Sequence, residues 1–168
     1  MYKTGHWGVA LLVWAPVGGG LLVAGQAAEA VVGGAGVLAL CRVPDYDMRL
    51  PLVSHRGSTH TVGFALLVGL ALGAGAAALA GGAGVVQPLV AGGFGFLVGT
   101  LSILSHLLAD VVTPAGIAPL WPLSGTNYSL DLARADSTVA NYALLALGVF
   151  VSVALLAVTP GLFHLAGS

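Results

Sequence analysis

The chain has 168 residues, of which 58% are hydrophobic and only 7% charged, and its formal net charge is −1. A soluble domain has about a quarter of its residues charged, so this composition excludes an ordinary soluble protein. The near-zero charge gives no electrostatic pull toward nucleic acid, and the single cysteine, Cys41, excludes an internal disulfide framework.

Five apolar runs follow one another at residues 7–24, 27–41, 61–80, 85–112 and 138–163. The last three are long enough to cross a bilayer, whose core is about 30 Å thick and takes roughly 20 helical residues. Pro16 and the glycines at 18–20 predict a bend or break in the first run, and the second is short. We predict one all-α membrane domain over residues 1–168, a polytopic integral membrane protein with four to five transmembrane or re-entrant helices.

Many of the 26 glycines lie inside the apolar runs. Gly69 and Gly73, and likewise Gly95 and Gly99, have the four-residue spacing of helices that pack closely in lipid. This spacing predicts close contacts for the third and fourth runs.

Two polar segments, 42–59 and 113–137, interrupt the apolar runs. If the first two runs form a hairpin, both segments and the N-terminus lie on one side of the membrane. Trp121 then lies at the membrane interface. The same side receives every lysine and arginine of the chain: Lys3, Arg42, Arg49, Arg56 and Arg134. The positive-inside rule makes this side cytoplasmic in a cell or inner membrane.

This topology also gathers seven potential ligands in one layer parallel to the membrane. They are His6, Asp45, Asp47, His55, His60, His106 and Asp110. Imidazole and carboxylate groups are the usual ligands of Zn²⁺, Mn²⁺ and Fe²⁺. Ionisable residues near a membrane interior indicate function, because burying them unpaired is costly.

Each group of ligands also has a simpler interpretation. His106 and Asp110 are four apart, so they share a helix face and either bind one ion or form a buried hydrogen bond. Asp45 and Asp47 follow Pro44 and could converge on a site from a loop, although such pairs are usually just solvated.

The segment HRGSTH at 55–60 is the most specific local pattern. Gly57 permits a tight turn, and Ser58 or Thr59 is expected to cap the following helix. Arg56, between two histidines, can bind phosphate or carboxylate; alternatively it meets lipid headgroups and the histidines are incidental. Two divalent ions would offset the repulsion among the aspartates, and nearby arginines would partly do the same.

At these residues the chain resembles the YdjM-like family, described as LexA-regulated, membrane-bound, metal-dependent hydrolases. The matching stretches are His6, VPDYD at 43–47, HRGSTH at 55–60, and SHLLADVVTPAG at 105–116 followed by LWPLS, which together cover Met1 to about Ser124. Where the family usually has a serine after the second histidine of this motif, Thr61 keeps the hydroxyl. The resemblance implies that the seven residues form the metal site, and it identifies no substrate.

The leading hypothesis is a hydrolase with one or two divalent ions, most simply zinc, with manganese or iron as alternatives. Asp45 or Asp47 would act as general base, and Arg56 would hold an anionic substrate. A site at headgroup depth favours a phosphoester such as a phospholipid or lipid-linked phosphate. The alternatives are a non-catalytic metal-binding protein and a metal transporter. The scarcity of polar residues in the middle of the third and fifth runs counts against transport. The oligomeric state stays open.

Overall fold

The computed structural model describes residues 1–49, 54–81 and 84–166, with side chains as far as Val158; the side chain of His164 therefore lies outside it. Within these ranges the chain is helical and has no strand, only an isolated bridge between Ile117 and Tyr128. The helices are α1 (Lys3–Val23), α2 (Ala27–Leu40), α3 (Val62–Leu79), α4 (Val86–Val111) and α5 (Thr138–Ala166), with short 3₁₀ helices η1 (Pro44–Arg49) and η2 (Ser58–His60). The predicted all-α class is confirmed.

Five segments of the described chain are long and apolar enough to cross a membrane. The first is unbroken, because α1 continues through Pro16, so the predicted break is wrong. Packing against neighbouring helices keeps proline and glycine helical in membranes; Gly19 lies against Leu155 of α5. The second apolar run is short as an α-helix, since α2 has 14 residues, but the chain continues into η1 and the whole segment Ala27–Arg49 reaches spanning length.

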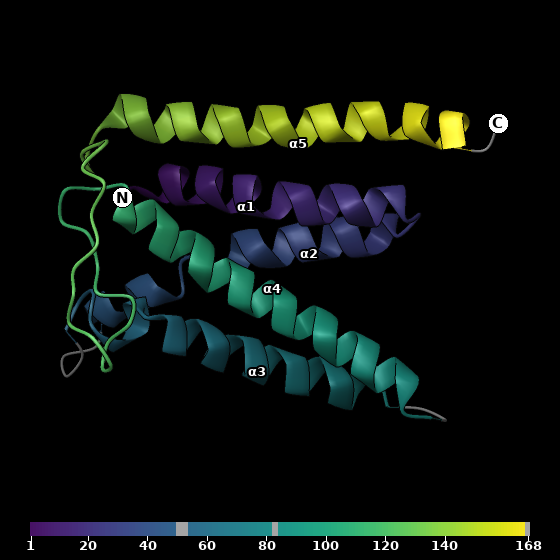
Figure 1. Ribbon diagram of the computed structural model, residues 1–168, viewed down its shortest axis with the longest axis horizontal. Helices are drawn as coiled ribbons and strands as arrows, with labels where there is room; N and C mark the ends of the chain where they lie inside the picture. The colour runs from purple at the N-terminus through teal and green to yellow at the C-terminus, as the bar shows by residue number, and fades with distance from the viewer. Residues whose placement is uncertain (50–53, 82–83, 167–168) are drawn as a thin grey trace.

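The helices form two hairpins and a fifth helix (Figure 1). Helix α1 packs on α2, α3 packs on α4, α4 also contacts α1 and α2, and α5 lies along α1. The start of α1, the end of α2, the start of α3, the end of α4 and the start of α5 meet at one end of the bundle, which we call the polar end. The predicted gathering of the five cations at one end is therefore confirmed, because each lies in a segment found there.

Glycine allows the close approach of α3 and α4. A Cβ atom on Gly99 would lie 2.9 Å from the Cα of Gly69, and one on Gly95 would lie 2.8 Å from the carbonyl oxygen of Leu72. Both predicted glycine pairs therefore lie at this interface. Gly8 and Gly148, which the spacing did not indicate, bring α1 and α5 together in the same way: a Cβ on Gly148 would lie 2.5 Å from the Gly8 oxygen.

Replacing Gly99 with leucine is expected to destabilise the α3–α4 hairpin. The new side chain meets backbone atoms that cannot move aside, and overpacking of this kind typically costs about 1–3 kcal/mol. Thermal unfolding of the detergent-purified protein should show a lower Tm. Gly93→Leu is the matched control on the same helix, because a Cβ there meets no atom within 4 Å. Equal Tm values for the two variants would contradict the close contact.

Candidate metal centre

The HRGSTH segment folds as a turn followed by η2. The backbone of Arg56 has φ of 61°, in the left-handed region, whereas Gly57 has φ of −87°. Gly57 is required by space instead: a Cβ there would lie 2.8 Å from the backbone carbonyl oxygen of Ser54. The prediction that Ser58 or Thr59 caps α3 is wrong, because both belong to η2. The cap is Thr61, whose hydroxyl accepts a hydrogen bond from the Phe64 amide at 3.1 Å, a role that serine would fill equally well.

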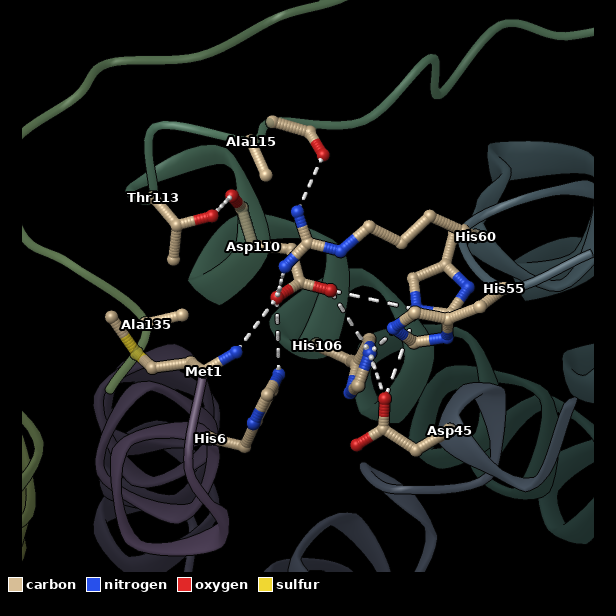
Figure 2. Close-up of polar contacts among 12 residues, drawn as sticks. Met1, His6, Asp45, His55, His60, His106, Asp110, Thr113, Ala115 and Ala135 are labelled. Atoms are coloured by element: carbon tan, nitrogen blue, oxygen red, sulfur yellow. Dashed lines mark hydrogen bonds and ion pairs between the residues drawn. The ribbon is translucent and has the colours of Figure 1, made fainter. Parts of the chain in front are cut away.

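Four side chains from three elements converge at the centre of the polar end (Figure 2). The Nε2 atoms of His60 and His106 lie 3.1 Å apart. Asp110 Oδ2 lies 3.5 Å from His60 Nε2 and 3.3 Å from His106 Nε2, and Asp45 Oδ1 lies 3.9 and 3.5 Å from the same two nitrogens. Ligand atoms about 2.0–2.1 Å from a tetrahedral ion are themselves about 3.3 Å apart. The donor atoms of His60, His106 and Asp110 therefore have the spacing of ligands around one ion, and Asp45 approaches the same two nitrogens without joining Asp110 in one group.

One buried histidine nitrogen in the cluster, Nε2 of His6, supports the presence of an ion. His6 donates from Nδ1 to the Tyr2 carbonyl at 3.1 Å, which leaves Nε2 unprotonated and 3.6 Å from Asp110 Oδ1. His6 Nε2 and His106 Nδ1 are both buried and have no hydrogen-bond partner in the described chain. The two rings stack with their centroids 4.1 Å apart. A buried nitrogen without a partner costs about 1–3 kcal/mol, and coordination of an ion would remove that penalty at His6.

Asp47 lies behind this centre and holds its histidines. One oxygen is 2.8 Å from His55 Nδ1. The other accepts from the Thr59 hydroxyl at 2.7 Å and the Arg56 amide at 3.3 Å, and lies 3.3 Å from His60 Nδ1. Burial, followed by the proximity of His106, lowers the pKa of His60 to about 4, so its imidazole is neutral at pH 7. Because the Asp47 carboxylate lies beside Nδ1 of His60, the Nε2 atom of His60 faces the other donors.

Positive charge also reaches the centre. The guanidinium of Arg56 donates to Asp110 Oδ1 at 3.2 Å and to the carbonyl of Gly116 at 3.0 Å. The α-amino group of Met1 lies 3.2 Å from the same Asp110 oxygen. One oxygen of the Asp110 carboxylate thus lies beside the two cations, and the other oxygen lies beside the imidazoles of His60 and His106. Arg56 thereby ties the segment after α4 to the turn before α3.

The described residues form three overlapping groups whose donor atoms lie within 4.8 Å of one another: His60, His106 and Asp110; His6, Asp45 and His106; and Asp45, His55 and His60. Six of the seven predicted ligands are therefore brought together, whereas Asp47 is in none of the groups. Sequence reasoning missed Thr59 as a partner of Asp47 and the Tyr2 carbonyl as a partner of His6. The sequence does place the Thr59 hydroxyl directly before His60, the second histidine of HRGSTH, and this position could have indicated such a contact.

A helical bundle with spanning segments and a buried His/Asp cluster at one end belongs to the class of polytopic membrane proteins with a candidate metal centre. The chain is a member of the YdjM inner membrane protein family, whose model matches residues 1–166. The match continues well past Ser124, where the recognisable motifs end. With its apolar helices, this membership makes the protein an integral inner membrane protein. Searches of curated proteins and of solved structures gave no significant match.

Proposed function

We propose that the protein is a membrane-bound, metal-dependent hydrolase of phosphoesters. The observation that carries this proposal is the convergence of carboxylate oxygens on two imidazoles: the Nε2 atoms of His60 and His106 lie 3.1 Å apart, and Asp110 Oδ2 and Asp45 Oδ1 each lie 3.3–3.9 Å from both. Of these five contacts only the one between the two Nε2 atoms is a hydrogen bond, in which one ring donates to the other, whereas the carboxylate oxygens make none with these nitrogens. A divalent ion that all of them approach would satisfy the imidazoles and the carboxylates together.

His60, His106 and Asp110 would hold one ion, and His6 would take part in a second, which leaves Asp45 beside the ions. A bound divalent ion polarises a phosphoryl oxygen and lowers the pKa of a coordinated water. Asp47 supports the site from behind, fixing His55 and His60 through both of its oxygens. This arrangement assigns Asp47 a positioning role rather than that of a ligand.

Asp45 is the best placed general base. Its side chain is 15% exposed, against 0% for Asp47 and 2% for Asp110, so a water can reach it. Asp45 Oδ1 would accept the proton of that water as it attacks phosphorus. Arg56 has only two of its five N–H donors used in the contacts above, and its side chain is 20% exposed. Its remaining donors would bind the phosphate oxygens of an anionic substrate.

The position of the centre narrows the substrate. It lies where the spanning segments end, which is the depth of lipid headgroups. A phospholipid or a lipid-linked phosphate presents its phosphoester at that depth. We therefore expect purified protein loaded with Zn²⁺, Mn²⁺ or Fe²⁺ to turn over at least one member of a panel of phospholipids and lipid phosphates, and to lose the activity in His60→Ala. Metal-loaded protein that hydrolyses none of the panel would contradict the proposal.

A non-catalytic metal site is the second candidate, and burial favours it. His6, His60, His106 and Asp110 are fully buried, as in sites where protein ligands enclose the ion and fasten helices together. The exposure of Asp45 and of His55, whose side chain is 41% exposed, leaves one side of the cluster open and favours catalysis. Metal-loaded protein that is inactive toward the whole panel would select this second candidate.

Removal of the metal is expected to lower stability. An ion that binds only the folded state stabilises it by about 2.7–4.1 kcal/mol at 100–1,000 times its Kd. Chelator treatment should lower the Tm of the detergent-purified protein, and restoring the metal should recover it. His60→Ala should have the lower Tm already and should not respond to chelator. A chelator response of the same size in that variant would place the ion elsewhere.

The five cations at the polar end predict that this end faces the cytoplasm. Gly125 lies in the polar segment after α4 and is exposed, and a Cβ there would meet no atom within 4 Å, while Cys41 is fully buried. Gly125→Cys should therefore react with a membrane-impermeant maleimide in inside-out vesicles and stay unlabelled in spheroplasts. Labelling in spheroplasts would place the site on the periplasmic side.

A further inference from the structure

Helix α5 supplies none of the seven candidate ligands, yet one of its side chains contacts the segment that carries His6. Asn141 lies in the first turn of α5 and is fully buried. A buried amide is costly unless its donors and its acceptor are hydrogen-bonded. Nδ2 of Asn141 donates to the carbonyl oxygens of Ala135 at 3.1 Å and Ser137 at 2.7 Å. Oδ1 accepts from the backbone amide of Tyr2 at 2.9 Å, so these partners fix which way the side-chain amide points.

The contact with Tyr2 leads on to His6. The Tyr2 carbonyl oxygen accepts one hydrogen bond from Nδ1 of His6 at 3.1 Å and another from the His6 amide at 3.2 Å. Because the proton is on Nδ1, Nε2 is the ring nitrogen that faces Asp110 Oδ1, 3.6 Å away. Histidines that bind metals usually donate from their second ring nitrogen to a carbonyl or carboxylate, which fixes the tautomer and the ring orientation. Tyr2 thus joins Asn141 to His6 through its own amide and carbonyl.

Small residues on α1 allow Asn141 to come this close. A Cβ on Gly5, directly before His6, would collide with Asn141 Oδ1. One turn further along α1, a Cβ on Gly8 would collide with the backbone of Leu144 on α5. The beginnings of the two helices are therefore in direct contact beside the metal centre.

We infer that Asn141 is a positioning residue of the metal centre, which holds the Tyr2 carbonyl where it orients His6 as a ligand. The inference rests on the proposed function for the presence of an ion beside His6. The alternative is a local role, in which Asn141 only closes the turn before α5, and the two bonds from Nδ2 serve that purpose. Oδ1, however, bonds to a residue 139 positions away in the sequence, which a local turn does not require.

Three variants separate the two roles. Asn141→Leu has a similar volume but removes the acceptor for the Tyr2 amide. Asn141→Asp keeps an acceptor there and loses both Nδ2 donors. Ser137→Ala is the local control, because the Ser137 hydroxyl accepts a hydrogen bond from the Ala140 amide at 3.3 Å at the start of α5. Asn141→Asp and Ser137→Ala should therefore lower the Tm without changing the orientation of His6.

The first measurement is the tautomer of His6 in metal-free protein, from the nitrogen chemical shifts of labelled histidine, assigned with His6→Gln. Wild type and Asn141→Asp should have the proton on Nδ1, and Asn141→Leu should show a mixture of tautomers. A proton on Nε2 in wild type, or an unchanged tautomer in Asn141→Leu, would overturn the inference. If Asn141→Leu does not fold, Asn141→Asp still decides, because loss of the Nδ1 tautomer there would mean that only the local bonds matter.

The second measurement is a Zn²⁺ titration, in which His6→Ala identifies the equivalent that depends on His6. Asn141→Leu should bind that equivalent about 10–100-fold more weakly than wild type, as expected when a supporting group is lost. Asn141→Asp and Ser137→Ala should match wild type. An unchanged Kd in Asn141→Leu, or no equivalent that depends on His6, would overturn the inference.

Turnover separates failure of this inference from failure of the proposed function. At saturating Zn²⁺, Asn141→Leu should regain wild-type turnover, because a positioning residue acts only through the ligand. Weakened Zn²⁺ binding in Asn141→Leu, in a protein that hydrolyses none of the phosphoesters, would reject the hydrolase and keep Asn141 as a positioning residue of a structural metal site. An active hydrolase in which Asn141→Leu changes neither the His6 tautomer nor the Kd for Zn²⁺ would reject the inference alone.

Discussion

Asp110→Asn should abolish metal binding and strongly destabilise the protein. The carboxylate faces the imidazoles of His60 and His106 with one oxygen, and Arg56 and the Met1 amine with the other. The amide keeps the shape of the side chain but loses the charge that attracts the ion and offsets the two cations. Removing one partner of a buried charge pair typically costs about 3–5 kcal/mol. Mass spectrometry should find about one or two metal equivalents in wild type and almost none in this variant, with a lower Tm.

Asp136→Asn is the control for this experiment. Asp136 pairs with Arg134 at 2.9 Å on the surface, and the guanidinium holds the pKa of that carboxyl below its usual value. Because the Asp136 side chain is 56% exposed, solvent screens this pair and its loss should change neither metal content nor Tm. Full metal content in Asp110→Asn would show that this carboxylate is a hydrogen-bond partner of the histidines rather than a ligand.

The gathering of the candidate ligands at one end could be predicted from the sequence, because the number of membrane spans between two residues decides whether they lie on the same side. Once the apolar runs are paired as hairpins, residues as distant as His6 and His106 must lie at the same end. The glycine pairs of α3 and α4 were predictable for a similar reason, since regular spacing on a helix fixes a face. Both predictions use only periodicity and length.

The arrangement inside the cluster could not be predicted in the same way. Asp45 and Asp47 are two residues apart on η1, yet one faces the other donors and one is held behind them by Thr59 and His55. That division depends on the geometry of a single 3₁₀ turn, which no spacing rule distinguishes. The left-handed backbone of Arg56 was equally hidden, because the adjacent Gly57 is the residue expected there. The continuity of α1 through Pro16 was hidden as well, because the apolar run does not show that Gly19, three residues later, lies against Leu155 of α5.

The two aspartates of η1 provide the second experiment, because the same substitution should act differently at each. Asp47→Asn disturbs the partner of His55 and His60, and loss of such a supporting carboxylate typically weakens metal affinity about 10–100-fold. Metal titration should show a weaker Kd but unchanged stoichiometry. Turnover should return close to the wild-type value when metal is saturating, as expected of a positioning residue.

Asp45→Asn should instead remain inactive at saturating metal. The amide cannot take a proton from an attacking water, and loss of a general base typically lowers kcat about 10²–10⁴-fold. Titration should still reach full occupancy, since three of the four central donors, on His60, His106 and Asp110, are unchanged. The informative quantity is kcat at saturating metal for the two variants side by side. If Asp47→Asn stayed inactive and Asp45→Asn recovered, the roles would be exchanged and Asp47, despite its burial, would be the base.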